Sequence, residues 1–322
     1  MAPLAIEVCL YDYSLVHLLA QRGKRMTLVS LANTKDRWKG VTTSIRALGL
    51  DSVKNQAVLI KPNFNTADPA PGSTHNDTLI ALVEELWAMG ARSISLGERS
   101  YPATRQVMEK KGIIPLLEEK DVRIIDFDQL GQADWVPFSH PELNWKEGFR
   151  VARPILEAEC LVSACCLKTH QFGGVITMSL KNSVGVVPTF RNGFDYMNEL
   201  HTSPRQQALI AEINLSFSPQ LVVMDGVDAF VDGGPATGKR ARGDVFIAAT
   251  DRVANDAVGT AILKHLGSND EIMNRKIFEQ GQIKRAAELG IGVKSASEIT
   301  LVAADEASQV YRDRVNTILM IG

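Results

Sequence analysis

The sequence has few cysteines, and none of them stands in a spacing that binds a metal or an iron–sulfur cluster. Its four cysteines are Cys9, Cys160, Cys165 and Cys166, without a Cys-x-x-Cys pair and without a histidine at zinc-site spacing. A cubane cluster needs a Cys-x-x-Cys-x-x-Cys pattern, so an iron–sulfur cluster is not supported. We interpret the three cysteines of the apolar segment 160–167 as buried free thiols of a protein in a reducing compartment.

Long apolar segments and an excess of one charge are also missing. No apolar run reaches the ~18–20 residues of a membrane span, and the N-terminus lacks the basic and then apolar pattern of a secretory signal. The 35 Lys and Arg residues nearly balance the 37 Asp and Glu residues, whereas a dedicated nucleic-acid binder carries a basic excess. We therefore expect a cytoplasmic protein that binds neither membranes nor nucleic acids.

What the sequence does have is a regular alternation of short apolar segments with longer helical patterns. The helical patterns lie at residues 76–89, 101–111, 176–187, 204–217 and 253–266. The apolar segments, which we interpret as buried strands, lie at residues 57–60, 92–96, 122–127, 161–167, 221–224, 245–249 and 299–303. This alternation predicts an α/β fold with a largely parallel sheet flanked by helices in three layers.

The length of 322 residues bounds the domain organisation, because single cores stop growing near ~250–300 residues. We expect residues 51–322 to form an α/β catalytic region. A smaller subdomain could begin near residues 131–150, which hold two Trp and two Pro without a clear period. We expect residues 1–50 to be an N-terminal extension packed on the core, with an edge strand at residues 6–10 and a helix at residues 36–48.

Polar residues follow several of the predicted strands at the point where each strand ends. Ligands of open α/β sheets bind beyond the carboxyl ends of the strands. If the strands are parallel and share one sheet, these residues converge on one edge. They are Lys61 and Asn63, then Lys168, Thr169 and His170, then Asp225 and Asp228, and finally Thr250 and Asp251.

The densest group of polar residues follows the Gly173-Gly174 pair. Thr177 and Lys181 would share one face of the predicted helix 176–187, while Ser179 and Asn182 lie on another side. A cation with hydroxyl and amide groups after a glycine turn is typical of a phosphate or carboxylate site. Neither a Walker motif nor a dinucleotide-binding glycine motif is present. A second glycine-rich loop at residues 231–238 either wraps a substrate or only turns the chain.

These patterns give a set of candidate site residues. For acid/base catalysis we select Lys168, His170, His201 and Asp225. A divalent metal could instead be held by His75, His170, His201 and Asp228. For substrate binding we select Lys61, Asn63, His75, Lys181, Asn182, Arg191, Gly233 and Gly234.

Together these motifs resemble the family described as domain of unknown function 362 (DUF362), over residues 57–254. The resemblance rests on residues 60–63, Thr74-His75, residues 167–170, residues 179–185, His201, Asp225-Gly226 and residues 233–238. Many members of that family carry a ferredoxin-like cysteine cluster, which this chain lacks. More remotely, the glycine-rich segment with His and Lys resembles the nickel-pincer lactate racemases.

Three functions are compatible with these observations. The first is an enzyme that acts on a small carboxylated or phosphorylated metabolite by acid/base chemistry, as an isomerase, racemase or lyase does. The second is a redox enzyme that uses a bound metal, an organic cofactor or a partner's electrons. The third is a non-catalytic anion-binding protein. The apolar pattern at residues 307–321 also leaves a homo-oligomer open.

Overall fold

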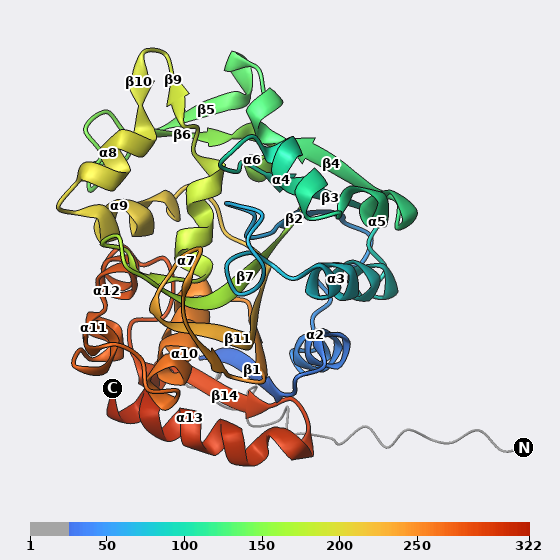
Figure 1. The fold of residues 1–322 in the computed structure, drawn as a ribbon, viewed down its shortest axis with the longest axis vertical. Helices are drawn as coiled ribbons and strands as arrows, with labels where there is room; N and C mark the ends of the chain where they lie inside the picture. The colour runs from blue at the N-terminus through green and yellow to red at the C-terminus, as the bar shows by residue number, and fades with distance from the viewer. Residues whose placement is uncertain (1–25) are drawn as a thin grey trace, which may run out of the picture.

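The apolar segments form one central sheet that lies between layers of helices (Figure 1). The computed structural model describes residues 26–322. The main path through the sheet has the strand order β14-β1-β13-β11-β7-β2-β3-β4, while β8 pairs with β7 and β12 with β11. The strands are β1 (Thr27–Asn33), β2 (Ala57–Lys61), β3 (Ser93–Glu98), β4 (Val122–Asp126), β7 (Cys160–His170), β8 (Val175–Thr177), β11 (Leu221–Gly233), β12 (Gly238–Arg242), β13 (Val245–Ala249) and β14 (Ile299–Ala303).

Strand direction decides which loops share an edge of this sheet. β11, β7, β2, β3 and β4 pair in parallel, and β1 pairs in parallel with β14. β13 is antiparallel to both of its neighbours, β1 and β11. The largely parallel sheet is therefore confirmed, but Thr250 and Asp251, which follow β13, lie at the opposite edge from Lys61 and Lys168.

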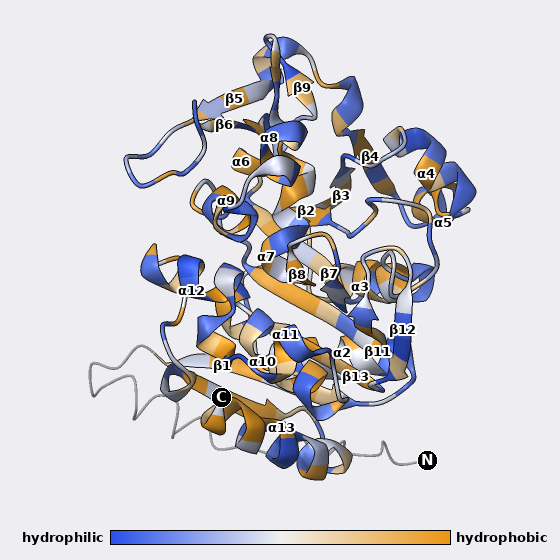
Figure 2. Ribbon diagram, turned by 60° about the vertical axis from the view of Figure 1, so that its left-hand side comes forward, coloured by the Kyte–Doolittle hydropathy of each residue, from blue (hydrophilic) through white to orange (hydrophobic). Residues whose placement is uncertain are grey.

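Each face of the sheet packs against its own helical layer because successive side chains of a strand point in opposite directions. The helices of these layers are α2 (Arg37–Arg46), α3 (Asn76–Ala88), α4 (Thr104–Lys110), α5 (Ile114–Glu119), α10 (Arg252–His265), α11 (Asp270–Met273), α12 (Gly281–Glu288) and α13 (Gln309–Ile321). On β7, Cys165 and Leu167 join the core beneath α10, α12 and α13, whereas Val162 and Ala164 join the core beneath α2 to α5. Figure 2 shows the hydrophobic stretch of β7 between these layers.

A third core contains several aromatic residues of the segment after β4, together with aliphatic residues. Trp145 lies with its ring centroid 5.5 Å from Phe149 and 6.5 Å from Tyr196. The elements around it are β5 (Trp135–Phe138), β6 (Phe149–Ala152), α6 (Arg153–Leu156), α8 (Tyr196–Thr202) and α9 (Gln206–Ile213), with the hairpin β9 (Phe190–Arg191) and β10 (Phe194–Asp195) beyond them (Figure 1). A subdomain boundary near residues 131–150 stays a prediction.

Two predicted elements differ from the observed ones. β11 continues through Gly226 to Gly233, so Asp225 lies inside the strand and not at its end. The helix predicted at residues 176–187 begins only at Ser179, and it consists of two short helical elements. β8 first pairs with β7 as far as Thr177, and only then do α7 (Ser179–Asn182) and the 3₁₀ helix η3 (Ser183–Val186) begin. The ladder with β7 supplies the backbone hydrogen bonds that a helix would otherwise have formed.

The N-terminal part of the described chain belongs to the sheet and its helical layer. The helix predicted at residues 36–48 is confirmed as α2, whose N-cap Asp36 accepts a hydrogen bond from the backbone N–H of Lys39. The strand β1, which the sequence pattern did not predict, lies between β14 and β13. The edge strand predicted at residues 6–10 lies outside the described residues.

The C-terminal helix α13 packs one side and exposes the other. Val315 and Leu319 are buried in the core, whereas Val310 and Ile321 are exposed. Packing on its own domain therefore accounts for the buried apolar positions of this helix. Self-association through the exposed positions stays a prediction.

We expect Gly40→Ala to destabilise the fold, although alanine usually stabilises a helix by about 1 kcal/mol relative to glycine. A Cβ at Gly40 would lie 2.2 Å from Cδ2 of Phe246 on β13, and such overpacking costs about 1–3 kcal/mol. The control is Gly131→Ala, where φ is −69° and the nearest atom lies at 3.4 Å. Urea unfolding of both variants measures the difference. A stabilised Gly40→Ala would contradict this packing.

Candidate functional site

A cavity of about 450 Å³ lies where β2, β3 and β7 end, at the edge of the sheet where parallel α/β folds bind ligands. Its lining is rich in cations, with a single carboxylate, Glu98, among the described residues that form it. The residues that line it are Lys61, Asn63, Phe64, Asn65, Thr66, Gly72, Glu98, Arg99, Tyr101, Lys168, His170, Phe172, Thr177, Lys181, Asn182, Val184, Gly185, Thr189, Met197, His201, Pro235 and Ala236.

Lys61 uses all of its donor capacity inside the protein. An ammonium group has three N–H donors, and those of Lys61 meet Glu98 Oε1 at 2.7 Å, the carbonyl of Pro62 at 2.8 Å and Asn182 Oδ1 at 3.3 Å. Burial lowers the pKa of Lys61, and the charge of Glu98 opposes that shift. Lys61 is therefore a buried ion-pair partner that supports the floor of the cavity.

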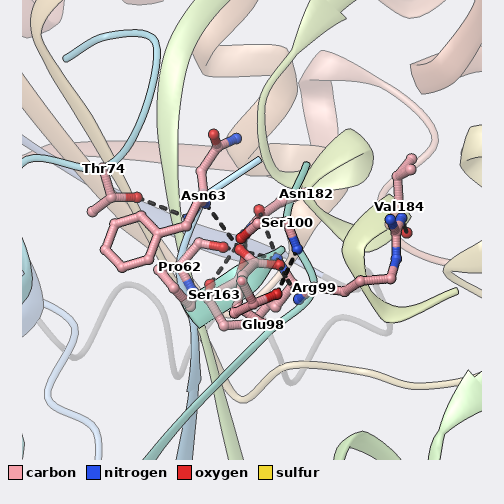
Figure 3. A network of polar contacts seen from close by, with 12 residues as sticks. Pro62, Asn63, Thr74, Glu98, Arg99, Ser100, Ser163, Asn182 and Val184 are labelled. Atoms are coloured by element: carbon pink, nitrogen blue, oxygen red, sulfur yellow. Dashed lines mark hydrogen bonds and ion pairs between the residues drawn. The ribbon is translucent and has the colours of Figure 1, made fainter. Parts of the chain in front are cut away.

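Glu98 and its neighbours form the polar network shown in Figure 3. The second oxygen of Glu98 accepts from the backbone N–H of Phe64 at 2.9 Å, and Oε1 accepts from that of Arg99 at 2.9 Å. The amide of Asn182 donates to the carbonyl of Lys61 at 3.1 Å and to Ser163 Oγ at 3.0 Å. Asn182 thus lines the cavity, but its amide binds the protein itself.

Lys168 is saturated in the same way. Its ammonium donates to Asn63 Oδ1 at 3.3 Å, to the carbonyl of Gly72 at 2.5 Å and to that of Pro235 at 3.1 Å. Gly72 and Pro235 belong to two loops that are far apart in the sequence, and both line the cavity. Lys168, selected from the sequence as catalytic, therefore holds these two loops together. Asn63, selected for substrate binding, is one of its acceptors.

Lys181 differs from both, because no hydrogen bond or ion pair to its ammonium occurs in residues 26–322. Desolvation, with the positive charges of Lys168 and Arg99, lowers the pKa of Lys181 to about 8. The ammonium is thus a cation in the cavity that lacks a protein counter-ion in the described part of the chain. An anionic ligand would supply that counter-ion.

The short helix α7 places Lys181, and buried groups from other elements fix both of its ends. Asp256 of α10 accepts from the backbone N–H groups of Ser179 at 2.8 Å and Leu180 at 2.9 Å. Asn214 donates to the carbonyl of Leu180 at 3.1 Å and to Ser183 Oγ at 3.0 Å. Four residues cannot form a stable helix by themselves, so these anchors set the position of Lys181.

Arg99 forms the wall beyond Glu98. Its guanidinium donates to the carbonyl of Val187 at 2.7 Å, to Thr189 Oγ1 at 3.0 Å and to the carbonyl of Val184 at 3.2 Å. Burial lowers the pKa of Arg99, which nevertheless remains a cation at neutral pH. Arg99 therefore adds positive charge to the cavity while it fixes the segment 184–189.

The hydrogen bonds of His170 identify which of its nitrogens carries the proton. The backbone N–H of Gly174 donates to Nδ1 at 3.2 Å, so Nδ1 is unprotonated. Burial, with the charges of Lys181 and Lys168, lowers the pKa of His170 to about 2. The ring is therefore neutral at physiological pH, and its proton is on Nε2, which makes Nε2 a hydrogen-bond donor.

His201 has the opposite tautomer. Its Nδ1 lies 2.7 Å from the carbonyl of Met197, and since a carbonyl only accepts, Nδ1 carries the proton. Desolvation lowers the pKa of His201 below its ordinary value, which leaves the ring neutral and Nε2 free to accept a proton. One cavity therefore contains a histidine Nε2 that donates and a histidine Nε2 that accepts.

The carboxylates selected from the sequence do not line this cavity. Asp225 accepts from Thr78 Oγ1 at 2.6 Å and from Arg37 Nε at 3.0 Å. Asp228 pairs with Arg37 at 3.2 Å and with Arg242 at 3.1 Å. The proposed catalytic role of Asp225 is thus not supported by its position, because the strand continues past it and its side chain ties α2 and α3 to the sheet.

His75 and Arg191 also lie away from the cavity lining. His75 is the N-cap of α3, where Nδ1 accepts from the backbone N–H of Asp77 at 3.1 Å. Arg191 stacks over the ring of Trp135 at 5.5 Å on the β9–β10 hairpin. Both residues therefore have local structural contacts that their sequence positions did not indicate.

Gly233 and Gly234 shape the cavity without lining it. The carbonyl of Gly233 accepts from Thr169 Oγ1 at 3.0 Å, and a Cβ on Gly234, whose φ is +79°, would lie 2.1 Å from the carbonyl oxygen of Thr169. Both backbone conformation and space therefore require glycine at residue 234. The loop reaches close to β7 and so brings Pro235 and Ala236 to the cavity.

The predicted metal ligands do not come together. His170 and His201 line the cavity, whereas His75 and Asp228 lie elsewhere. Within residues 26–322, no group of three or more His, Cys, Asp and Glu side chains is arranged to hold a metal ion. Cys160, Cys165 and Cys166 are buried free thiols of β7.

Glu98, Arg99 and Thr177 are cavity residues that were not selected from the sequence. Glu98 and Arg99 follow the predicted strand at residues 92–96 just as Lys61 follows its own strand, so the same strand-end rule would have found them. Thr177 was noticed for its spacing from Lys181 on the predicted helix, but the helix begins only after Thr177. This residue lies on β8, and its buried hydroxyl has no hydrogen-bond partner among the described residues.

None of the helices within residues 26–322 combines the length and apolarity needed to span a bilayer.

A lactate racemase apoprotein from Thermoanaerobacterium thermosaccharolyticum superposes with a TM-score of 0.41 at 15% identity, over 69% of this chain and 54% of that one. This similarity is too low to indicate a reaction.

A sequence relative is the thylakoid-associated protein sll1697 of Synechocystis sp., which is 26% identical over 211 residues. The matched region is 64% of this chain and 63% of that protein, so the chain spans less than two thirds of its relative's length. The model of the domain of unknown function DUF362 matches residues 58–261. Because that match covers more than half of the chain, as the motifs predicted, the chain belongs to the DUF362 family.

Proposed function

We propose that this protein is an enzyme that acts on a small carboxylated or phosphorylated metabolite by acid/base chemistry. The proposal rests on one combination of groups in the cavity. The ammonium of Lys181, which has no partner in the described part of the chain, lies with His170 and His201, whose tautomers are opposite. Perturbed titratable groups gather at active sites because catalysis needs them. The reaction that suits this set is an isomerisation, racemisation or elimination.

Lys181 would bind the anionic group of the substrate. Within residues 26–322 its ammonium has no hydrogen-bond acceptor, and the cavity around it also contains the positive charges of Arg99 and Lys168. The pairing would raise the pKa of Lys181 and relieve the cost of its unpaired charge. Lys61 and Lys168, whose donors bind the protein, would contribute only their electrostatic field.

His201 would act as the general base. Its unprotonated Nε2 would accept a proton from the carbon next to the carboxylate or another carbonyl group, and the electron pair of the C–H bond would move onto the carbonyl oxygen. His170 would donate from Nε2 to that oxygen, as a neutral imidazole does in oxyanion stabilisation. Return of the proton would give an isomer, and loss of a leaving group from the adjacent carbon would give an alkene.

Solvent exchange tests this chemistry at the reacting C–H bond, whatever the identity of the substrate. In D₂O, a panel of 2-hydroxy, 2-keto and phosphorylated acids should contain at least one compound that takes up deuterium at the activated carbon, as mass spectrometry would show. We expect His201→Gln to slow that exchange by about 10²–10⁴-fold. The control is His140→Gln, since His140 lies outside the cavity lining. Binding of a compound that is never exchanged or converted would indicate a binding protein.

The pH dependence of kcat/KM should be bell-shaped. Activity should rise as His201 loses its proton, at a pH below the ordinary histidine pKa because that pKa is lowered. It should fall as Lys181 loses its proton near pH 8. We expect Lys181→Arg to move the basic limb to higher pH, since arginine stays protonated. A basic limb that stays in place in this variant would remove Lys181 from that role.

Substitutions of two lysines should separate binding from folding. Lys181→Met should weaken the binding of anions by about 10–100-fold, which is the loss of a charged hydrogen bond. The free energy of unfolding of this variant should stay level or increase, because the substitution removes a half-buried charge that has no partner among residues 26–322. Lys168→Met should lower the free energy of unfolding by about 1–3 kcal/mol or more, since three acceptors lose their donor.

Calorimetric titration with inorganic phosphate or acetate, together with urea unfolding of each variant, measures both effects. The reverse pattern would contradict the distinction drawn between these lysines. In that pattern Lys181→Met unfolds more easily, and Lys168→Met keeps full stability while losing only its affinity for anions.

A further inference from the structure

Two aromatic side chains of the cavity are largely exposed to solvent. Phe172 is 63% exposed and Tyr101 is 75% exposed, although both line the same cavity as Lys181. They come from different loops, since Phe172 lies between β7 and β8 and Tyr101 between β3 and α4. Because burial of an aromatic ring is strongly favourable, these rings offer contact area to a bound molecule.

We infer that the substrate is an anion whose body is a planar ring. Its charged group would bind at Lys181, and its ring would lie against Phe172 and Tyr101. This inference rests on the proposed function, because it takes Lys181 as the site of the anionic group. It adds the class of molecule that the rest of the cavity selects.

The part of the cavity that contains Lys181 has a second polar group without a hydrogen-bond partner among the described residues. Thr177 is 4% exposed, and its Oγ1 has no hydrogen-bond partner among the described residues, although it lines the cavity with Lys181. A buried hydroxyl without a partner costs about 1–3 kcal/mol. A carboxylate or phosphate that accepts from both Lys181 and Thr177 would remove this cost and the cost of the unpaired charge together.

The part of the cavity near Phe172 and Tyr101 offers aromatic and apolar surface. Phe172 packs edge-on against His170, with ring centroids 5.9 Å apart and an interplanar angle of 82°. The backbone N–H of Tyr101 donates to the carbonyl of Asn65 at 2.6 Å. Met197 and Val184 add apolar surface to the lining, and a methionine sulfur packs well against an aromatic edge. This part of the cavity therefore suits a flat apolar group.

The size of the cavity supports the same conclusion. Its volume of about 450 Å³ lies within the range of about 300–1,000 Å³ that accommodates ligands larger than a few heavy atoms. An acid of two or three carbons would bind at Lys181 and leave the surface of Phe172 and Tyr101 in contact with water. A ring-bearing acid would cover Phe172 and Tyr101 as well.

Matched acids test the inference by calorimetric titration of the full chain. Benzoate, cyclohexanecarboxylate and acetate share a carboxylate, but only benzoate has a planar ring. We expect benzoate to bind about three- to tenfold more tightly than cyclohexanecarboxylate, as aromatic pairing contributes beyond its area, and acetate to bind most weakly. Phe172→Ala and Tyr101→Ala should each reduce the preference for benzoate. The control is Phe190→Ala, since Phe190 is 52% exposed but does not line the cavity.

The outcomes separate this inference from the proposed function. Equal affinity for benzoate and cyclohexanecarboxylate would overturn the ring-binding inference. It would also be overturned if Phe172→Ala changed the preference for benzoate no more than the control Phe190→Ala does. A failure of benzoate to bind at millimolar concentration while smaller acids undergo deuterium exchange would overturn it as well. In that case the acid/base proposal would still hold. Benzoate binding that Lys181→Met leaves unchanged would instead contradict the anion site of the proposed function.

Discussion

A buried ammonium group needs an acceptor for each of its protons, and this need shapes the site. Lys61 donates to Glu98, to a carbonyl and to Asn182, and so joins β2, β3 and α7. Lys168 donates to Asn63 and to the carbonyls of two loops. These contacts build the cavity walls and use up the donors of both residues. Lys181 also lines the cavity, and among the described residues its ammonium has no acceptor, so a ligand could supply one.

The cavity combines three properties that are separate in the sequence. An excess of positive charge favours an anion. Backbone contacts, from the N–H of Gly174 and to the carbonyl of Met197, set opposite tautomers on His170 and His201. The aromatic rings of Phe172 and Tyr101 lie on the same cavity surface. An anion that carries an activated C–H bond and a flat body would use all three, which links the proposed reaction to the proposed substrate class.

The sequence also pointed to residues that lie outside the cavity lining. Asp225, His75 and Arg191 are polar residues near predicted strand ends or turns, and each is engaged in a local contact with Arg37, Asp77 or Trp135. The difference arises because a polar residue beside a turn can cap a helix or bridge two layers as readily as it can bind a ligand. Only the position of its partners distinguishes these roles.

By itself, the order of apolar and polar residues determined the α/β class, the largely parallel sheet and the placement of Lys61, Lys168 and His170 at its carboxyl edge. Those features follow from side-chain periodicity and from the direction of parallel strands. Only the tertiary structure decided the rest. In it β13 runs antiparallel to its neighbours, β11 continues past Asp225, and residues 175–177 form a strand. It also shows which lysine of the cavity has no acceptor among the described residues. These outcomes depend on hydrogen bonds between segments far apart in the chain, which local sequence patterns do not encode.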